Sequence, residues 1–254
     1  MTDLYYHLID PTGNLTILVE TPVPVASQAF VAQRLLSAEP TAEQVGFLSA
    51  PDADCDIALR MAGGEFCGNA AMSAAALHCM RLGAAEQTVR VRISGTVTPV
   101  RVTATDGYAC TVEMPRPKRL TEAFGYPLVE LPGIAHLIVT EPMARDAAEA
   151  AAVRDCAALG AEALGLMLLD EAAQTLTPLV YVAAPQTLCW EHSCASGTAA
   201  VGACLAAKRA TPIALSLREP GGILRVEAAP DGAICLSGTV RHVHARTLSA
   251  AHFT

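Results

Sequence analysis

A cysteine at the start of an alanine-rich stretch occurs twice in this chain, once in each half. The first copy reads GGEFCGNAAMS over residues 63–73, and the second reads HSCASGTAA over residues 192–200. Cys67 and Cys194 therefore lie half the chain length apart. Self-similarity at such a separation is typical of a duplicated structural unit. The sequence predicts two copies of one fold, each with a cysteine at the same place.

The segments that follow the two cysteines predict buried helices. Residues 68–82 carry Ala, Met and Leu on all sides, and an equally apolar segment ends near Arg209. A helix that is apolar all round is buried, so strands must wrap each one. With 52% hydrophobic and 17% charged residues, the chain can bury such a core. We therefore expect a pseudo-two-fold protein with a cleft between its halves.

The remainder of each half predicts strands joined by turns, with Pro115 and Pro117 marking the linker because proline blocks regular structure. Helices are expected at residues 27–36 with Ser27 as the N-cap, 68–82 with Gly83 as the stop, 145–164, and from Cys194 to about Arg209. Strands are expected at residues 4–7, 15–20, 44–48, 57–61, 89–93, 97–103, 109–114, 135–139, 166–169, 179–183, 213–217, 223–228, 233–237 and 240–246.

Two thiols at helix N-termini indicate acid–base chemistry on a carboxylic acid. The free N–H groups and the dipole of a helix N-terminus favour a thiolate and lower the pKa of the thiol. The same N–H groups form a site for a carboxylate. If Cys67 and Cys194 face each other across the cleft, one sulfur can remove an α-proton while the other returns a proton to the opposite face. That transfer would invert the stereocentre.

Charge and hydropathy argue against several classes of partner. The net charge is −8, which disfavours nucleic acid and anionic membrane surfaces. No apolar run reaches the roughly 18 residues of a membrane helix, and the N-terminus lacks a signal-peptide pattern. Nine cysteines, an odd number, without an export signal favour free thiols in a reducing cytoplasm. A small molecule is the expected partner, with no nucleic acid and no membrane.

Neither a cofactor nor a metal is expected. Pyridoxal phosphate would need a lysine for its Schiff base, and the two lysines, Lys118 and Lys208, lie in the linker and at a helix end. A metal site at His192 with Cys194, or at His242 with His244, has ligand-like spacing. No CxxC or HExxH motif accompanies either pair.

At the two cysteine motifs the chain resembles the diaminopimelate epimerase family of cofactor-independent, two-cysteine racemases. The family pattern C-G-N-G-A corresponds to residues 67–71, and its pattern A-C-G-[ST]-G corresponds to residues 193–197. The resemblance implies an α/β (α+β) fold of two pseudosymmetric domains, each a mainly antiparallel curled sheet around a central helix. The implied domains are residues 1–116, with a C-terminal strand at 241–254 returning to them, and residues 117–240.

Two departures from that family concern the substrate. The family motif E-R-G-x-G-E-T-x-A-C carries a Glu and an Arg that help to read the distal end of diaminopimelate, and here Pro185 and Gln186 hold the matching positions. A second amino-acid head group would lack its partners, and burying it unpaired would be costly. Ala195 stands where the family has glycine, and its methyl group narrows the second anion site.

A narrower likeness is to the histidine racemases that supply D-histidine for staphylopine-type opine metallophores. Matching stretches are residues 11–18, 43–47, 65–70 and 190–198. The likeness implies Cys67 and Cys194 as the catalytic pair, Glu43 as an acceptor for an imidazole N–H, and these substrate-binding residues: Asn14, Glu43, Gln44, Gly68, Asn69, His136, Ala195 and Ser196.

The expected activity is a cofactor-independent racemisation of histidine for metallophore biosynthesis. Two alternatives stay open at this stage: a diaminopimelate epimerase with altered distal recognition, and a non-catalytic amino-acid-binding or thiol-redox protein. A homodimer is an open option for the assembly.

Overall fold

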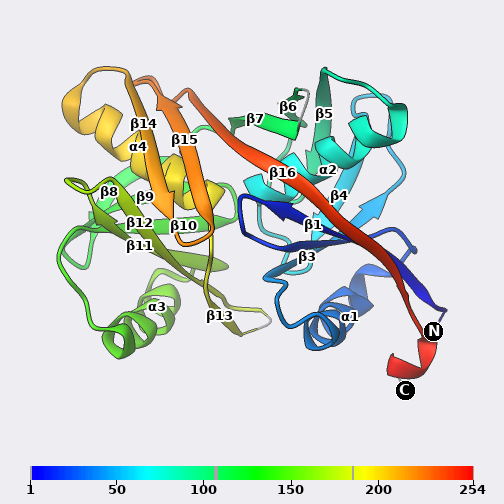
Figure 1. The fold of residues 1–254 in the computed structure, drawn as a ribbon. Coiled ribbons are helices and arrows are strands. Elements are labelled where there is room, and N and C mark those ends of the chain that lie inside the picture. The colour runs from blue at the N-terminus through cyan, green and yellow to red at the C-terminus, as the bar shows by residue number, and fades with distance from the viewer. Residues whose placement is uncertain (1, 106–107, 185, 254) are drawn as a thin grey trace. The chain divides into compact units, whose positions relative to one another are not determined.

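The computed structural model describes residues 2–105, 108–184 and 186–253. They form two compact units (Figure 1). Unit 1 is drawn from Met1–Val112 and Thr239–Thr254, and unit 2 is Glu113–Gly238. The single strand β16 (Ile234–Leu248) takes part in both, because its first residues pair in unit 2 and its last residues pair in unit 1.

Unit 1 is a curled sheet with one helix on each side of it. Its elements in chain order are β1 (Leu4–Pro11), β2 (Thr16–Val19), α1 (Val25–Ala38), β3 (Gln44–Ser49), β4 (Ile57–Met61), α2 (Gly68–Leu82), β5 (Gln87–Ile93), β6 (Val100–Ala104) and β7 (Ala109–Met114). The strands lie in this order, and β16 is next to β7 and also pairs with β1. A short 3-10 helix, η2 (Ala250–Phe253), follows β16.

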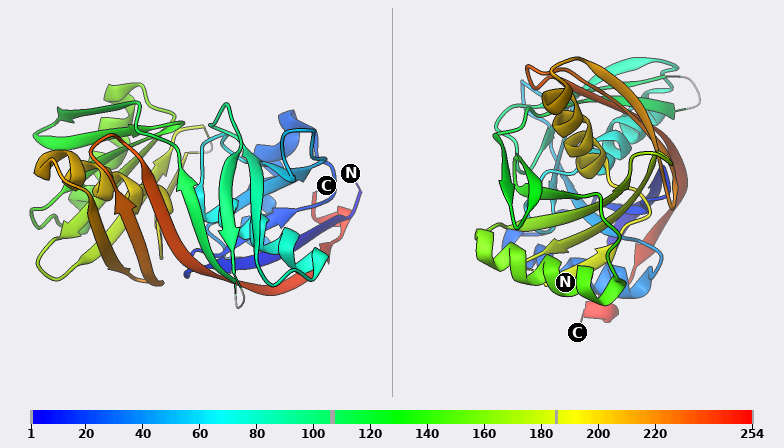
Figure 2. Two further views of the ribbon diagram at one scale, coloured as in Figure 1. Left: turned by 90° about the horizontal axis from the view of Figure 1, so that it is seen from above. Right: turned by 90° about the vertical axis from the view of Figure 1, so that its left-hand side faces the viewer.

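Unit 2 repeats this plan. Its elements are β8 (Arg119–Ala123), β9 (Tyr126–Leu131), β10 (Ile134–Val139), α3 (Arg145–Leu159), β11 (Ala163–Asp170), β12 (Thr175–Val182), β13 (Thr187–Trp190), α4 (Ala195–Arg209), β14 (Ile213–Glu219) and β15 (Gly222–Ala228). Figure 2 shows α3 and α4 on opposite sides of β9 to β12.

The strand pairings identify the two units as copies of one topology. In unit 1, α1 connects the parallel strands β2 and β3, and α2 connects the parallel strands β4 and β5. In unit 2, α3 connects the parallel strands β10 and β11, and the short strand β13 followed by α4 connects the parallel strands β12 and β14. Eleven other pairings are antiparallel: β1–β2, β1–β16, β3–β4, β5–β6, β6–β7, β8–β9, β9–β10, β11–β12, β12–β13, β14–β15 and β15–β16. The predicted fold class is confirmed.

The helices α2 and α4 are buried as their composition predicts. Eleven residues of α2 are buried, from Gly68 to Cys79, and α2 contacts β1, β2, β4, β5 and β6. The helix α4 contacts β9, β10, β11, β14 and β15 in the same way. Gly83 ends α2 in the left-handed conformation at φ 64°, which glycine adopts without a Cβ clash.

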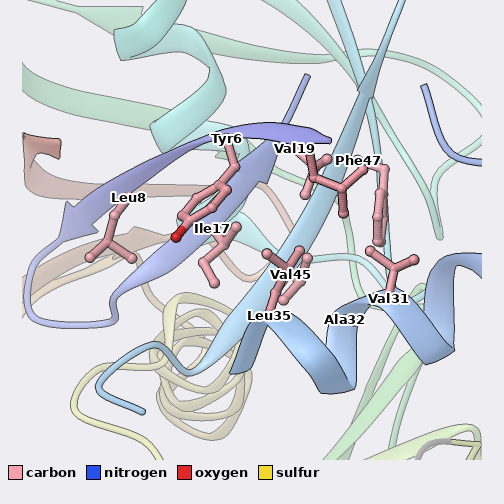
Figure 3. Close-up of a cluster of buried hydrophobic side chains, with 10 residues drawn as sticks. Tyr6, Leu8, Ile17, Val19, Val31, Ala32, Leu35, Val45 and Phe47 are labelled. Atoms are coloured by element: carbon pink, nitrogen blue, oxygen red, sulfur yellow. The ribbon is translucent and has the colours of Figure 1, made fainter. Parts of the chain in front are cut away.

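A second hydrophobic core lies under the outer helix of each unit. In unit 1, α1 directs Val31 and Leu35 toward Ile17 and Phe47 of the sheet (Figure 3). In unit 2, Ala148 and Ala152 of α3 belong to the corresponding cluster. Burying such side chains stabilises the fold by about 25 cal/mol per Å² of apolar surface. The outer helix of each unit therefore contributes to stability by covering an apolar face of the sheet.

Several local predictions were wrong. Ser27 is not the N-cap of α1: Pro24 holds that position, and the helix begins at Val25. The third helix stops at Leu159 rather than Leu164, because Gly160 takes the left-handed conformation at φ 62°. The hairpin β8–β9 and the short strand β13 were missed. The two strands expected at 233–237 and 240–246 are the single strand β16.

Candidate active site

The two cysteines occupy the same structural position in their units. Cys67 is the N-cap of α2, with φ −135° and ψ 113°, and its sulfur accepts a hydrogen bond from the Ala70 amide at 3.3 Å. Cys194 is the N-cap of α4, with φ −128° and ψ 100°, and its sulfur accepts from the Gly197 amide at 3.4 Å. A cysteine sulfur thus takes the capping role that a serine or aspartate oxygen usually has.

Both sulfurs are shielded from water. Cys67 is 7% exposed and Cys194 is 4% exposed. Gly68 and Asn69 open α2, Ala195 and Ser196 open α4, and all four are buried. The amides of a first helical turn have no acceptor within the helix, so each turn offers backbone donors beside its sulfur. This holds for each unit by itself.

Cys67 contacts a neutral amide. Its sulfur lies 2.6 Å from Oε1 of Gln44, to which the thiol donates. Gln44 starts β3 and pairs with Thr16 of β2. An amide carries both an acceptor oxygen and a donor NH2 group. By rotating its side-chain amide, Gln44 can therefore accept from the thiol or donate to the thiolate. The structure therefore brings two predicted site residues together.

Asn14 and Glu43, two further predicted site residues, are hydrogen-bonded to each other in unit 1. The Asn14 side chain donates from Nδ2 to Oε2 of Glu43 at 2.8 Å. Thr16 in turn donates from its hydroxyl to the Asn14 carbonyl at 3.1 Å. Asn14 is fully buried, and these bonds fix the Glu43 carboxylate one residue before Gln44.

A glycine turn outside the predicted set positions the Cys67 loop. The Ser94 hydroxyl donates to the Glu65 carbonyl at 2.8 Å and accepts from the Met61 amide at 2.9 Å. Gly95 has φ 80°, and a Cβ there would lie 2.5 Å from the Phe66 backbone nitrogen. The sequence signal was present as the expected hairpin turn at 94–96, but its contact with the loop before Cys67 joins segments that are distant in sequence.

We expect Gly95→Ala to destabilise the protein by about 1–3 kcal/mol, because the left-handed backbone and the contact with Phe66 both disfavour a side chain. Denaturant unfolding followed by far-UV circular dichroism measures this change. Gly125→Ala is the matched control, since Gly125 has φ 85° but a Cβ at that position would meet no atom within 4 Å. Equal destabilisation of the two variants would mean that backbone strain alone, and not the close approach to Phe66, makes Gly95 necessary.

Two carboxylates, those of Glu191 and Glu219, lie near Cys194. Its backbone N–H donates to Oε2 of Glu219 at 2.7 Å, and the Ser196 hydroxyl lies 3.6 Å from its sulfur. Burial, then Glu191, then Glu219 raise the pKa of the Cys194 thiol well above its usual value, while Ser196 opposes them. The expectation of a lowered thiol pKa is therefore wrong for Cys194: desolvation and two negative charges outweigh the helix dipole.

Glu219 was missed by sequence reasoning, although a signal was present. It ends β14, where burial alternates along the strand, and it falls on the same buried face as Leu217. A carboxylate is rarely buried without a partner. Here Thr198 donates to Oε1 of Glu219 at 2.5 Å and Cys194 donates to Oε2.

His136 is fully buried on β10 of unit 2. Burial lowers its pKa to about 3, so the ring is neutral. Within residues 2–105, 108–184 and 186–253, neither ring nitrogen has a hydrogen-bond partner. Gly165 is its neighbour on β11, and a Cβ at Gly165 would overlap Nδ1 of the ring. The absence of a side chain at residue 165 therefore makes room for this imidazole.

The other sequence-derived candidates have structural contacts. His242 contacts His7 at 3.0 Å, and His244 lies 3.5 Å from Glu39. In the described part of the chain, no group of three or more His, Cys, Asp or Glu side chains is arranged to hold a metal ion.

No helix among the described residues is long and apolar enough to span a membrane. Of Pro185 and Gln186, which hold the positions of the family Glu and Arg, Pro185 lies outside the described residues.

A cavity of about 510 Å³ in unit 1 does not contain the predicted residues. Its lining includes Gln28, Arg60 and Arg81. Arg60 donates to Gln28, and Arg81 is paired with Glu20, so the polar groups of this cavity are already engaged with one another.

Comparison with known sequences gives a consistent set of relatives. The family model described as "Histidine racemase CntK N-terminal domain" matches residues 3–244. A histidine racemase from Staphylococcus aureus (strain Mu50) is 32% identical over 210 residues, which is 76% of each chain. A histidine racemase from Fusobacterium nucleatum is 29% identical over 215 residues, covering 76% of this chain and 78% of that protein.

Solved structures share the fold at low sequence identity. A predicted epimerase from Pseudomonas aeruginosa has a TM-score of 0.71 at 17% identity, covering 97% of this chain and 99% of that one. A hydroxyproline epimerase from Agrobacterium vitis, solved with trans-4-hydroxy-L-proline, has a TM-score of 0.68 at 14% identity, covering 98% and 94%. These likenesses support the two-domain epimerase-like architecture.

Proposed function

This chain belongs to the histidine racemase family and is an amino-acid racemase, and from that premise we propose that it interconverts L- and D-histidine with Cys67 and Cys194 as its acid–base pair. The observation that carries the proposal is the duplicated N-cap: two sulfurs with nearly the same backbone angles, each bonded to the amide three residues later.

In the proposed reaction, one cysteine acts as a thiolate and the other as a thiol. The thiolate takes the α-proton, so the Cα–H bond breaks and an S–H bond forms. The electron pair left on Cα is delocalised into the carboxylate. The second thiol then gives its proton to the opposite face of Cα and becomes a thiolate. One proton is taken and one is returned, so the net change is inversion alone, and the reverse sequence converts the other enantiomer.

We assign the substrate carboxylate to the N-terminal amides of the two central helices. The donors would be the backbone N–H groups of Gly68, Asn69, Ala195 and Ser196. Fixed donors stabilise charge as it develops on a carboxylate oxygen, and a water-excluded site strengthens that effect. The burial of both cysteines supports a site of this kind.

We assign the imidazole of histidine to Glu43. Its carboxylate is held by Asn14, and an oriented carboxylate accepts an N–H bond more strongly than a neutral acceptor does. His136 is proposed to line the same pocket. Its neutral ring, with no hydrogen-bond partner in the described residues, fits a position that a ligand completes.

The pair of thiols supplies both the acid and the base, so the proposed proton transfer needs no cofactor. We further propose that the D-histidine formed enters the assembly of an opine metallophore, in keeping with the likeness to racemases of that type.

The test is to incubate the protein with L-histidine in deuterated water and a thiol reductant. We expect the circular dichroism signal of L-histidine to decay to zero and one deuterium to enter at Cα of the D-product, as measured by mass spectrometry. Diaminopimelate is the comparison substrate. Faster turnover of diaminopimelate would overturn the substrate assignment, and binding of histidine without α-exchange would overturn the proposed acid–base role.

A further inference from the structure

Each cysteine sulfur lies beside polar side chains of its own unit. Cys67 contacts the amide of Gln44. Glu191 from the loop before α4 and Glu219 from the end of β14 both raise the pKa of the Cys194 thiol, whereas the hydroxyl of Ser196 lowers it. A racemase with two thiols needs one ionised and one protonated at the start of each turnover, so a negative charge beside one thiol can decide which one carries the proton.

Glu219, at the end of β14, is hydrogen-bonded to the first turn of α4. Its two oxygens accept from the Cys194 amide at 2.7 Å and from the Thr198 hydroxyl at 2.5 Å. Glu219 is 4% exposed and Thr198 is fully buried. The turn after β14 is itself anchored, because the Gly221 amide donates to the His192 carbonyl at 2.7 Å.

We propose that Glu219 is a positioning residue for Cys194: its buried carboxylate fixes the cysteine backbone and keeps the proton on the sulfur in the resting enzyme. The inference rests on the proposed function for the role of Cys194. It adds that Cys194 starts the cycle as the proton donor, in the half-reaction that Cys67 begins as the base. A negative charge in a site of low dielectric disfavours a second negative charge beside it.

The experiment follows the ionisation of Cys194 directly, without relying on activity. Protein labelled with ¹³Cβ-cysteine is titrated by NMR, and the Cys194 signal is assigned by its loss in Cys194→Ser. We expect Glu219→Gln to titrate at lower pH than the wild type, because the amide keeps the acceptor oxygen but removes the charge. Glu219→Asp keeps the charge and is expected to titrate near the wild-type midpoint.

Two further variants define the controls. Thr198→Val leaves the carboxylate in place and is expected to leave the midpoint almost unchanged. Glu191→Gln removes the other neighbouring carboxylate and serves as the positive control for a detectable downward shift. In the wild type, the Cys194 amide proton is expected far downfield, as for an N–H that donates to a carboxylate, and this measurement needs no variant.

Coincident titrations of Glu219→Gln and the wild type would overturn the proposal, as would a Cys194 amide proton at an ordinary chemical shift. The two proposals fail separately. If Cys194→Ser retained full racemisation, the acid–base assignment would fail while the titration result stood. If Cys194→Ser were inactive and Glu219→Gln titrated as the wild type does, the role of Glu219 alone would fail.

Discussion

Replacing either Cys67 or Cys194 with serine is expected to lower kcat for racemisation by about 10²–10⁴-fold, the range typical of losing a general acid or base. A serine hydroxyl ionises far less readily than a thiol, so it can neither take the α-proton at neutral pH nor return one at a comparable rate. The measurement is the decay of optical rotation of L-histidine and, separately, of D-histidine.

The fold should survive both changes. Serine is among the preferred N-cap residues, and each cysteine sulfur already caps its helix by accepting from an amide. The matched controls are Cys79→Ser in α2 and Cys204→Ser in α4, which change a thiol in the same helices but at positions 12 and 10 residues further on. We expect them to keep the wild-type rate.

The double variant distinguishes a cooperating pair from two independent groups. Residues that act as a unit give effects that do not add, so Cys67→Ser combined with Cys194→Ser should be about as slow as either single variant. Wild-type racemisation in one of the single variants would remove that cysteine from the mechanism. Multiplicative losses in the double variant would argue that the two sulfurs contribute separately.

Replacing Glu43 with glutamine is expected to lower kcat/KM for histidine by roughly ten- to a hundredfold. A hydrogen bond to a charged group contributes about 1.5–3 kcal/mol, and each 1.36 kcal/mol corresponds to a tenfold change in rate. Glutamine keeps the shape of the side chain and an oxygen for Asn14, whose Nδ2 donates to Glu43 in the structure. The loss would therefore report the charge that we propose to face the imidazole.

The control for this change is Glu130→Gln on β9. Glu130 pairs with Arg119 in unit 2, and an exposed pair of this kind contributes little, so kcat/KM should stay at the wild-type value. The informative comparison is between substrates. The contrary result would be that Glu43→Gln lowers kcat/KM by the same factor for histidine and for a slow substrate without an imidazole. In that case Glu43 does not recognise the imidazole, and the proposed source of substrate preference is wrong.

Local features of both units could be predicted from the sequence. The helix α2 spans Gly68–Leu82 and ends at Gly83, as expected. This was predictable because a glycine that ends a helix and an all-apolar helical stretch are both visible in consecutive residues. The duplication was equally visible, since it depends only on repeated motifs. The hairpin β8–β9 was missed because all of β8 except Ala123 is exposed, so no apolar alternation marks it.

The chemistry around the cysteines was only partly predictable. Resemblance to a family predicted both Gln44 and Cys67 as site residues, and the structure adds that the Gln44 side chain contacts the Cys67 sulfur. The role of Gly165 beside His136 was not predicted, because it depends on the register of β10 against β11.

The repeated fold, the ends of the central helix in unit 1 and a sulfur at the N-cap of each central helix all follow from the amino-acid sequence alone. The ionisation of Cys194 depends instead on contacts that form when the chain folds. The pKa of a thiol depends on burial and on charges within a few ångströms, and Glu219 reaches Cys194 from 25 positions further along the chain. Helix starts are encoded by adjacent residues, whereas the electrostatic environment is set by segments that meet only after folding.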